Sequence, residues 1–77
     1  MSDIKNKLDH IFYVVLKIAK SKNKKNLNFK NVKKWDSLNH INLILAIESK
    51  FRIKIKPEQN FKLNSYNKIF VFLKKNL

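Results

Sequence analysis

Ser37 is a side chain that could do chemistry, and it stands where an apolar helix is expected to begin. Its hydroxyl could cap that helix by accepting a hydrogen bond from an amide that the helix leaves unpaired at its start. The same unpaired amides favour an anionic group held at this point. Asp36, directly before it, is an alternative cap.

Ser37 could instead be a catalytic nucleophile, with His40 three residues further along the same helix. A nucleophile needs a base oriented by a third group, and donors that stabilise an oxyanion. No third group is placed to orient His40, and the chain has no glycine to shape an oxyanion loop. We therefore expect no catalytic residues. His40 is expected to face solvent or a partner, and His10 to be a surface residue.

The elements that must position Ser37 follow from the spacing of apolar residues, which predicts four helices. Pro57 suits the first turn of a short helix, and Ser65 is placed to cap the last one. The expected fold class is all-α, a small bundle of three principal helices and one short helix. The predicted helices cover residues 3–19, 37–50, 58–63 and 65–76.

Residues 20–36 lose this periodicity and are rich in lysine and asparagine, which predicts a long loop. Apolar residues recur through the loop and are expected to anchor it to the core. These anchors are Leu27, Phe29, Val32 and Trp35.

The helix that begins at Ser37 carries two apolar stripes, so it needs burial on more than one side or a partner on the second. The first stripe contains Leu43, Ile47 and Phe51. The second contains Leu38, Ile41 and Leu45.

The length of 77 residues predicts one domain over residues 1–77, and an apolar fraction of 44% is enough for a core. With no cysteine, two histidines and five scattered carboxylates, we expect no metal site. No apolar run reaches the length of a membrane-spanning helix, and the first residues do not resemble a signal peptide. We expect a cytoplasmic monomer.

The net charge of +13 suggests a partner such as nucleic acid or an anionic membrane. Biased composition is a competing explanation, because lysine and asparagine are abundant while Arg52 is the single arginine. A nucleic-acid binder more often uses arginine, whose planar fork reads phosphates and base edges. We expect no nucleic-acid partner, and a small basic nucleic-acid-binding module stays the alternative function.

The segment 35–48 resembles the start of the second helix in acyl and peptidyl carrier proteins, where an Asp-Ser-Leu triplet opens the helix. Residues 51–55 match the aromatic and alternating apolar positions that follow this helix in the family, and residues 65–73 match its last helix. The resemblance covers nearly the whole chain. It implies a bundle of the acyl-carrier-protein type.

The resemblance implies that Ser37 carries a 4′-phosphopantetheine arm, moved from coenzyme A by a phosphopantetheinyl transferase. The protein would then be a carrier of acyl or aminoacyl thioesters and not an enzyme. Its implied partners are ligases that activate acyl or aminoacyl groups, and acyltransferases or synthases. An adaptor with the same fold but no arm is a further alternative.

The resemblance also suggests roles for the apolar stripes. Five residues are expected in the core, where they could also line a space for an acyl chain: Leu43, Ile47, Phe51, Ile69 and Leu73. Six residues are expected to contact partners: Asp36, Leu38, His40, Ile41, Leu45 and Glu48.

One feature departs from the best-known fatty-acid carriers, whose second helix is strongly acidic. Here the helix shows Asn39, Asn42 and Lys50, and Glu48 is its one carboxylate besides Asp36 before it. Complementary charge steers partners together and rejects wrong ones. We therefore expect a specialised stand-alone carrier, whose partners bind it through apolar contacts or are themselves acidic.

Overall fold

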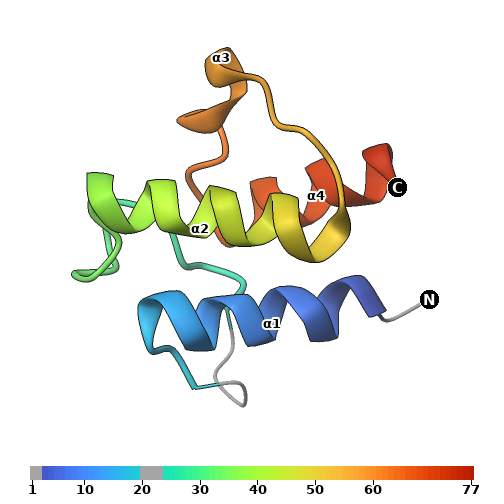
Figure 1. Ribbon diagram of the computed structural model, residues 1–77. Helices are drawn as coiled ribbons and strands as arrows, with labels where there is room; N and C mark the ends of the chain where they lie inside the picture. The colour runs from blue at the N-terminus through green and yellow to red at the C-terminus, as the bar shows by residue number, and fades with distance from the viewer. Residues whose placement is uncertain (1–2, 20–23) are drawn as a thin grey trace.

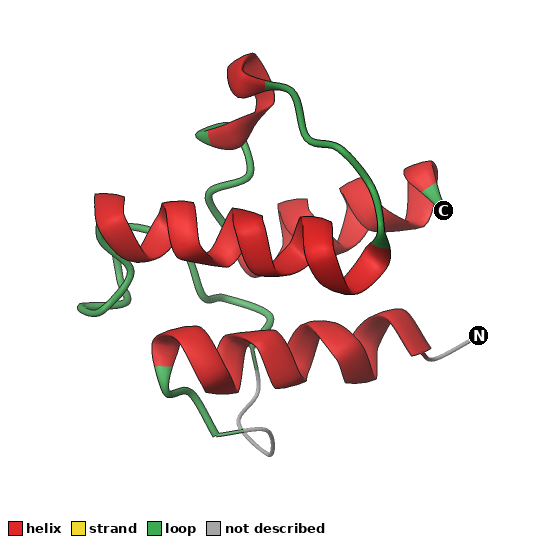
Figure 2. Cartoon of the chain, viewed as in Figure 1, coloured by secondary structure: helices red, strands yellow, loops and turns green. Residues whose placement is uncertain are grey.

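A computed structural model describes residues 3–19 and 24–77 of the chain. Three long helices and one short helix follow in order: α1 (Asp3–Leu16), α2 (Ser37–Phe51), α3 (Pro57–Asn60) and α4 (Tyr66–Asn76). α1 packs against α2 and α4, and α3 lies on the side of α2 away from α1 (Figure 1). Figure 2 shows helices joined by loops, with no strand among the described residues, and one isolated β-bridge pairs Asn28 with Ser65. The predicted all-α bundle is confirmed.

The apolar residues whose spacing predicted the helices form one core between α1, α2 and α4. The ring of Phe12 lies at its centre, edge-on to Trp35 at 5.4 Å and to Tyr66 at 5.1 Å. Such edge-to-face contacts add to the stabilisation from apolar burial. The apolar side chains with at most 2% exposure are Leu8, Phe12, Leu16, Trp35, Leu43, Ile47, Ile69 and Leu73.

The loop before α2 is held against the bundle as the sequence predicted. Trp35 is fully buried, and the other three predicted anchors are partly buried against the core. The amide of Phe29 donates to the Asn64 carbonyl at 2.8 Å, and the amide of Tyr66 donates to the Leu27 carbonyl at 3.0 Å. These bonds fix the loop to the start of α4. Residues 20–23 of the predicted loop lie outside the described residues.

α1 ends at Leu16, so the predicted end at residue 19 is wrong. Lys17 takes a left-handed conformation with φ of 59°, which stops the helix, and Ile18 turns back into the core. Glycine is the residue that usually makes this turn, and the chain contains none. No sequence signal therefore marked the end.

The other helix limits differ less from their predictions. α2 extends one residue further, to Phe51. α3 covers residues 57–60 rather than 58–63, because the amides of Lys62 and Leu63 bond three residues back and form a turn instead of a further helical turn. α4 begins at Tyr66, and Ser65 is its cap as predicted, with its hydroxyl oxygen accepting from the Lys68 amide at 3.1 Å.

A buried ionic cluster joins α1, the loop and α4. Asp9 accepts a hydrogen bond from Lys5 Nζ at 2.8 Å and another from the Tyr66 hydroxyl at 2.6 Å, and Lys24 Nζ lies 3.7 Å away. Burial alone raises the pKa of Asp9, but these bonds and the positive charges hold that pKa below its ordinary 3.8. Burial and the bond to Asp9 raise the pKa of Tyr66 above its ordinary 10.0.

Candidate functional site

Ser37 is the first residue of α2 and is exposed. Asp36 is the cap: its backbone is extended, and its Oδ1 accepts from the Asn39 amide at 2.9 Å. Within residues 3–19 and 24–77, no group makes a hydrogen bond to the Ser37 hydroxyl. Of the two possible caps, Asp36 has taken that role, which leaves the serine oxygen accessible.

The chain on both sides of Ser37 is held by hydrogen bonds. The Asn39 side-chain amide donates to the Lys34 carbonyl at 2.7 Å, and the His40 amide donates to the Asp36 carbonyl at 2.7 Å. The buried indole of Trp35 lies two residues before the serine. A group attached to Ser37 would therefore project from a fixed point.

His40 is fully buried, so the prediction that it faces solvent or a partner is wrong. Trp35 Nε1 donates to His40 Nδ1 at 2.9 Å, which makes Nδ1 an acceptor and assigns the proton to Nε2. Nε2 then donates to the Asn60 carbonyl at 2.6 Å. The imidazole also stacks on Phe61 at 4.8 Å.

This geometry removes His40 as a base for Ser37, because both ring nitrogens are bonded to other groups. His40 instead connects α2 to the end of the loop and to the end of α3. Its burial has a sequence signal, since it stands three residues before Leu43 and seven before Ile47, on the stripe that faces the core. His10, by contrast, is exposed as expected.

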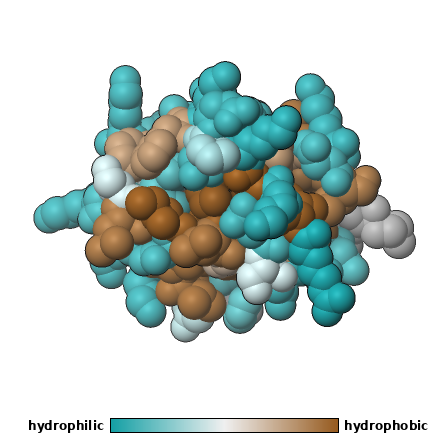
Figure 3. All heavy atoms as spheres, turned by 45° about the horizontal axis from the view of Figure 1, so that its top comes forward, coloured by the Kyte–Doolittle hydropathy of each residue, from teal (hydrophilic) through white to brown (hydrophobic). Residues whose placement is uncertain are grey.

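The second apolar stripe of α2 remains uncovered by the rest of the chain. Leu38 is 69% exposed, Ile41 46% and Leu45 57%. Phe61, at the end of α3, is 54% exposed and was not among the predicted contact residues. We call these four residues the outer apolar face. Figure 3 shows one face of the molecule, on which apolar residues gather among hydrophilic side chains.

Both carboxylates predicted to contact partners are engaged within the chain. Asp36 caps α2, and Glu48 Oε2 accepts from the Ile55 amide at 2.7 Å. Lys50 is exposed in the last turn of α2, and Lys54 is exposed in the linker that follows. The two carboxylates at this helix are therefore hydrogen-bonded within the chain, while its exposed lysine adds positive charge at its far end.

The residues predicted to line an acyl space all contribute to the core. Leu43, Ile47, Ile69 and Leu73 are fully buried, and Phe51 is partly buried against them. They join α2 and α4 through the centre of the bundle. A role in enclosing an acyl chain stays a prediction.

The exposed serine therefore stands directly after the capping aspartate, at the start of the second of three long helices in a small helical bundle. The chain is 35% identical over 68 residues to the acyl carrier protein of Buchnera aphidicola subsp. Schizaphis graminum (strain Sg). That match covers 88% of this chain and 86% of the Buchnera protein, whereas no family model matches. The chain belongs to the acyl carrier protein family. The described residues include no helix long and apolar enough to cross a membrane.

Proposed function

We propose that this protein carries acyl or aminoacyl groups on a 4′-phosphopantetheine arm attached to Ser37. The observation that carries the proposal is an exposed serine hydroxyl with no partner in the described part of the chain, at the start of α2 in a member of this family. Asp36 supports the role by capping the helix in place of the serine.

The surroundings of Ser37 suit a phosphodiester. The first amides of α2 point out of the helix end, where the helix dipole favours negative charge. Lys33 and Lys34 are exposed just before the helix and add positive charge. When attached, the arm supplies a terminal thiol that holds the cargo as a thioester. The contribution of this chain is to present that thiol from a rigid helix end.

The proposed partners are a phosphopantetheinyl transferase, ligases that activate acyl or aminoacyl groups, and acyltransferases or synthases. Apolar contacts at the outer apolar face would provide much of the binding, because large exposed apolar side chains are the usual centre of an interface. The face lacks free carboxylates of α2, which favours a specialised pathway over enzymes that recognise an acidic helix.

The test is incubation with coenzyme A, magnesium and several broad-specificity phosphopantetheinyl transferases, followed by intact mass measurement. Wild-type protein should gain the mass of one phosphopantetheine, and Ser37→Ala should gain nothing. Ser49→Ala is the matched control, because Ser49 is also an exposed serine of α2, and it should be modified as wild type is. An unchanged wild-type mass with every transferase would favour the adaptor without an arm.

A further inference from the structure

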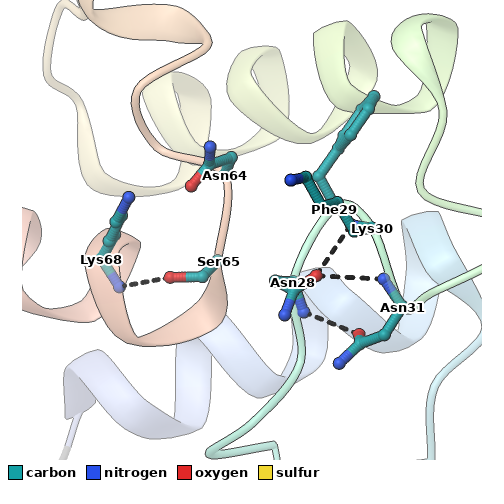
Figure 4. Close-up of a pocket in the computed structure, with 7 residues that line it drawn as sticks. All are labelled: Asn28, Phe29, Lys30, Asn31, Asn64, Ser65 and Lys68. Carbon is teal, nitrogen blue, oxygen red and sulfur yellow. Dashed lines mark hydrogen bonds between the residues drawn. The ribbon is translucent and has the colours of Figure 1, made fainter.

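α4 begins between two hollows that share Lys68 and lie apart from the residues assigned to the carrier function. The loop hollow, of about 480 Å³, lies between residues 28–31 and the residues that lead into α4 (Figure 4). The helix hollow, of about 340 Å³, lies between the end of α3 and the outer side of α4.

Three side-chain oxygens that line the loop hollow already accept hydrogen bonds within the chain, and the Asn64 side chain offers both a donor and an acceptor. Asn28 Oδ1 already accepts from the amides of Lys30 and Asn31, at 2.8 and 3.0 Å, and Asn31 Oδ1 accepts from the Asn28 amide at 2.9 Å. The Ser65 oxygen accepts from the Lys68 amide (Figure 4). The ammonium groups of Lys30 and Lys68 are left to bind a ligand. A ligand that fits must supply acceptors, and carboxylates pair well with ammonium groups.

The helix hollow combines an apolar surface with a positive rim. Leu63, Val71 and Phe72 provide the apolar part, and Val71 is 40% exposed. Lys62 and Lys75 join Lys68 at the rim. No carboxylate lines either hollow, and none lies within ion-pair distance of these lysines in the described part of the chain.

We propose that the two hollows together bind an acidic amphipathic peptide segment of a partner protein. Its carboxylates would pair with Lys30, Lys62, Lys68 and Lys75, and its apolar side chains would cover Val71 and neighbouring apolar surface. An apolar cavity of about 150 Å³ holds one benzene ring, so the helix hollow has room for about two large side chains. This proposal is independent of the arm on Ser37.

Two other anionic partners fit the hollows less well. A nucleic acid would leave the apolar surface of Val71 and Phe72 without a matching group, since its phosphate backbone is polar. A flat bilayer would contact protruding side chains before it reached concave surfaces. An amphipathic peptide satisfies both the positive rim and the apolar surface.

The test uses a fluorescein-labelled helical peptide that carries leucines on one face, flanked by glutamates, and measures its binding by anisotropy. Lys68→Glu should weaken binding about tenfold, because it places like charges together at the point that the hollows share. Glutamate suits the first turn of a helix, so this variant should fold. Lys33→Glu is the control: it makes the same charge change at an exposed lysine that lines neither hollow, and binding should fall by about twofold or less.

Two further experiments test the apolar contact between the peptide and the helix hollow, and the place where the peptide binds. Val71→Ser, and a peptide with its leucines replaced by serine, should each weaken binding severalfold. Amide shifts of the labelled protein should concentrate at Leu63, Lys68 and Val71. Ser37→Ala should bind the peptide as wild type does, so failure of the arm to attach leaves this result unchanged.

Three results would overturn the proposal. One is equal loss of binding in Lys68→Glu and Lys33→Glu. Another is a set of amide shifts centred on Leu38, Ile41 and Leu45, which would move the contact to the outer apolar face. The third is binding to phosphatidylglycerol vesicles or duplex RNA that depends on Lys68 while the peptide does not bind, which would assign the hollows to a membrane or to nucleic acid.

Discussion

His40 holds three segments of the molecule together through its two ring nitrogens. Nδ1 accepts from Trp35 at the end of the loop, and Nε2 donates to Asn60 at the end of α3. Only a neutral imidazole protonated at Nε2 satisfies both bonds. The position of Phe61 relative to Ser37 therefore depends on this side chain, since Phe61 stacks on the same ring.

Replacing His40 by phenylalanine retains a ring and removes both hydrogen bonds. The Trp35 indole N–H and the Asn60 carbonyl would lose their partners, at about 1–3 kcal/mol for each group that stays buried. We expect the free energy of unfolding to fall by about 2–4 kcal/mol, measured by urea denaturation. His10→Phe makes the same change at an exposed position and should cost about 0.5 kcal/mol or less. Equal losses in the two variants would contradict this role.

At the scale of single residues, the sequence predicted which apolar side chains are buried better than which groups the polar side chains bond. The apolar positions of α2 divide into buried and exposed stripes as expected, because a 3.6-residue repeat fixes which side chains share a face. His40 was misplaced because a histidine on a buried stripe needs partners distant in sequence, and Asn60 is twenty residues away. Glu48 was expected to contact partners, and the sequence did not reveal that its Oε2 accepts from the Ile55 amide seven residues away.

At the scale of elements, α2 ends in an unusual way. Arg52 takes a left-handed conformation, with φ of 56° and ψ of 49°, and the next amide, that of Ile53, donates to the Glu48 carbonyl at 3.2 Å. This conformation costs a residue with a Cβ about 1–2 kcal/mol, whereas glycine adopts it freely. The end of α2 therefore stores strain that its sequence does not relieve.

Arg52→Gly should raise the stability of the protein by about 0.5–1 kcal/mol, the relief of strain exceeding the extra entropy of the unfolded chain. A gain of 1 kcal/mol raises Tm by about 4–8 °C in a domain of this size, which calorimetry can measure. Lys54→Gly is the control, because Lys54 follows in the linker without a left-handed backbone. It should lower Tm, and a similar fall for Arg52→Gly would argue against strain at this helix end.

The sequence predicted which helices exist better than where they end. Apolar spacing locates the three long helices because burying those faces drives the packing of the bundle. The left-handed residues Lys17 and Arg52 carry no local signal, since only glycine or asparagine usually marks such a position. Tertiary contacts, such as the burial of Ile18, decide those ends.

At the scale of the whole molecule, a net charge of +13 is spread over a body of 28 × 27 × 18 Å. Repulsion among the lysines opposes the compact state. The Asp9 cluster opposes this repulsion, because it joins α1, the loop and α4 around one carboxylate. Sequence alone could not reveal this cluster, because Tyr66 is 57 residues from Asp9 along the chain.

Acid should therefore destabilise the fold through Asp9. The pKa of Asp9 is lower in the folded chain than its ordinary value of 3.8. The contribution of its carboxylate to the free energy of unfolding is therefore complete above pH 3.8. That contribution is lost as the pH falls from 3.8 towards the pKa of the folded chain. Asp9→Asn should cost about 1–3 kcal/mol at neutral pH and show a shallower loss of stability in acid, measured by denaturation at a series of pH values.

Asp3→Asn is the control for this experiment, because it makes the same substitution at an exposed position of the same helix. It should cost about 0.5 kcal/mol and keep the acid loss of wild type. An unchanged acid loss in Asp9→Asn would show that other groups control stability at low pH.

Trp35, which donates to His40, also gives the molecule an internal fluorescent probe. Trp35 is the chain's one tryptophan, so all indole emission comes from a fully buried ring two residues before Ser37. Excitation of this ring reports on the start of α2 without any label. The emission maximum and lifetime can then follow attachment of a group at Ser37, docking near Phe61 and local opening of the loop as separate events in one sample.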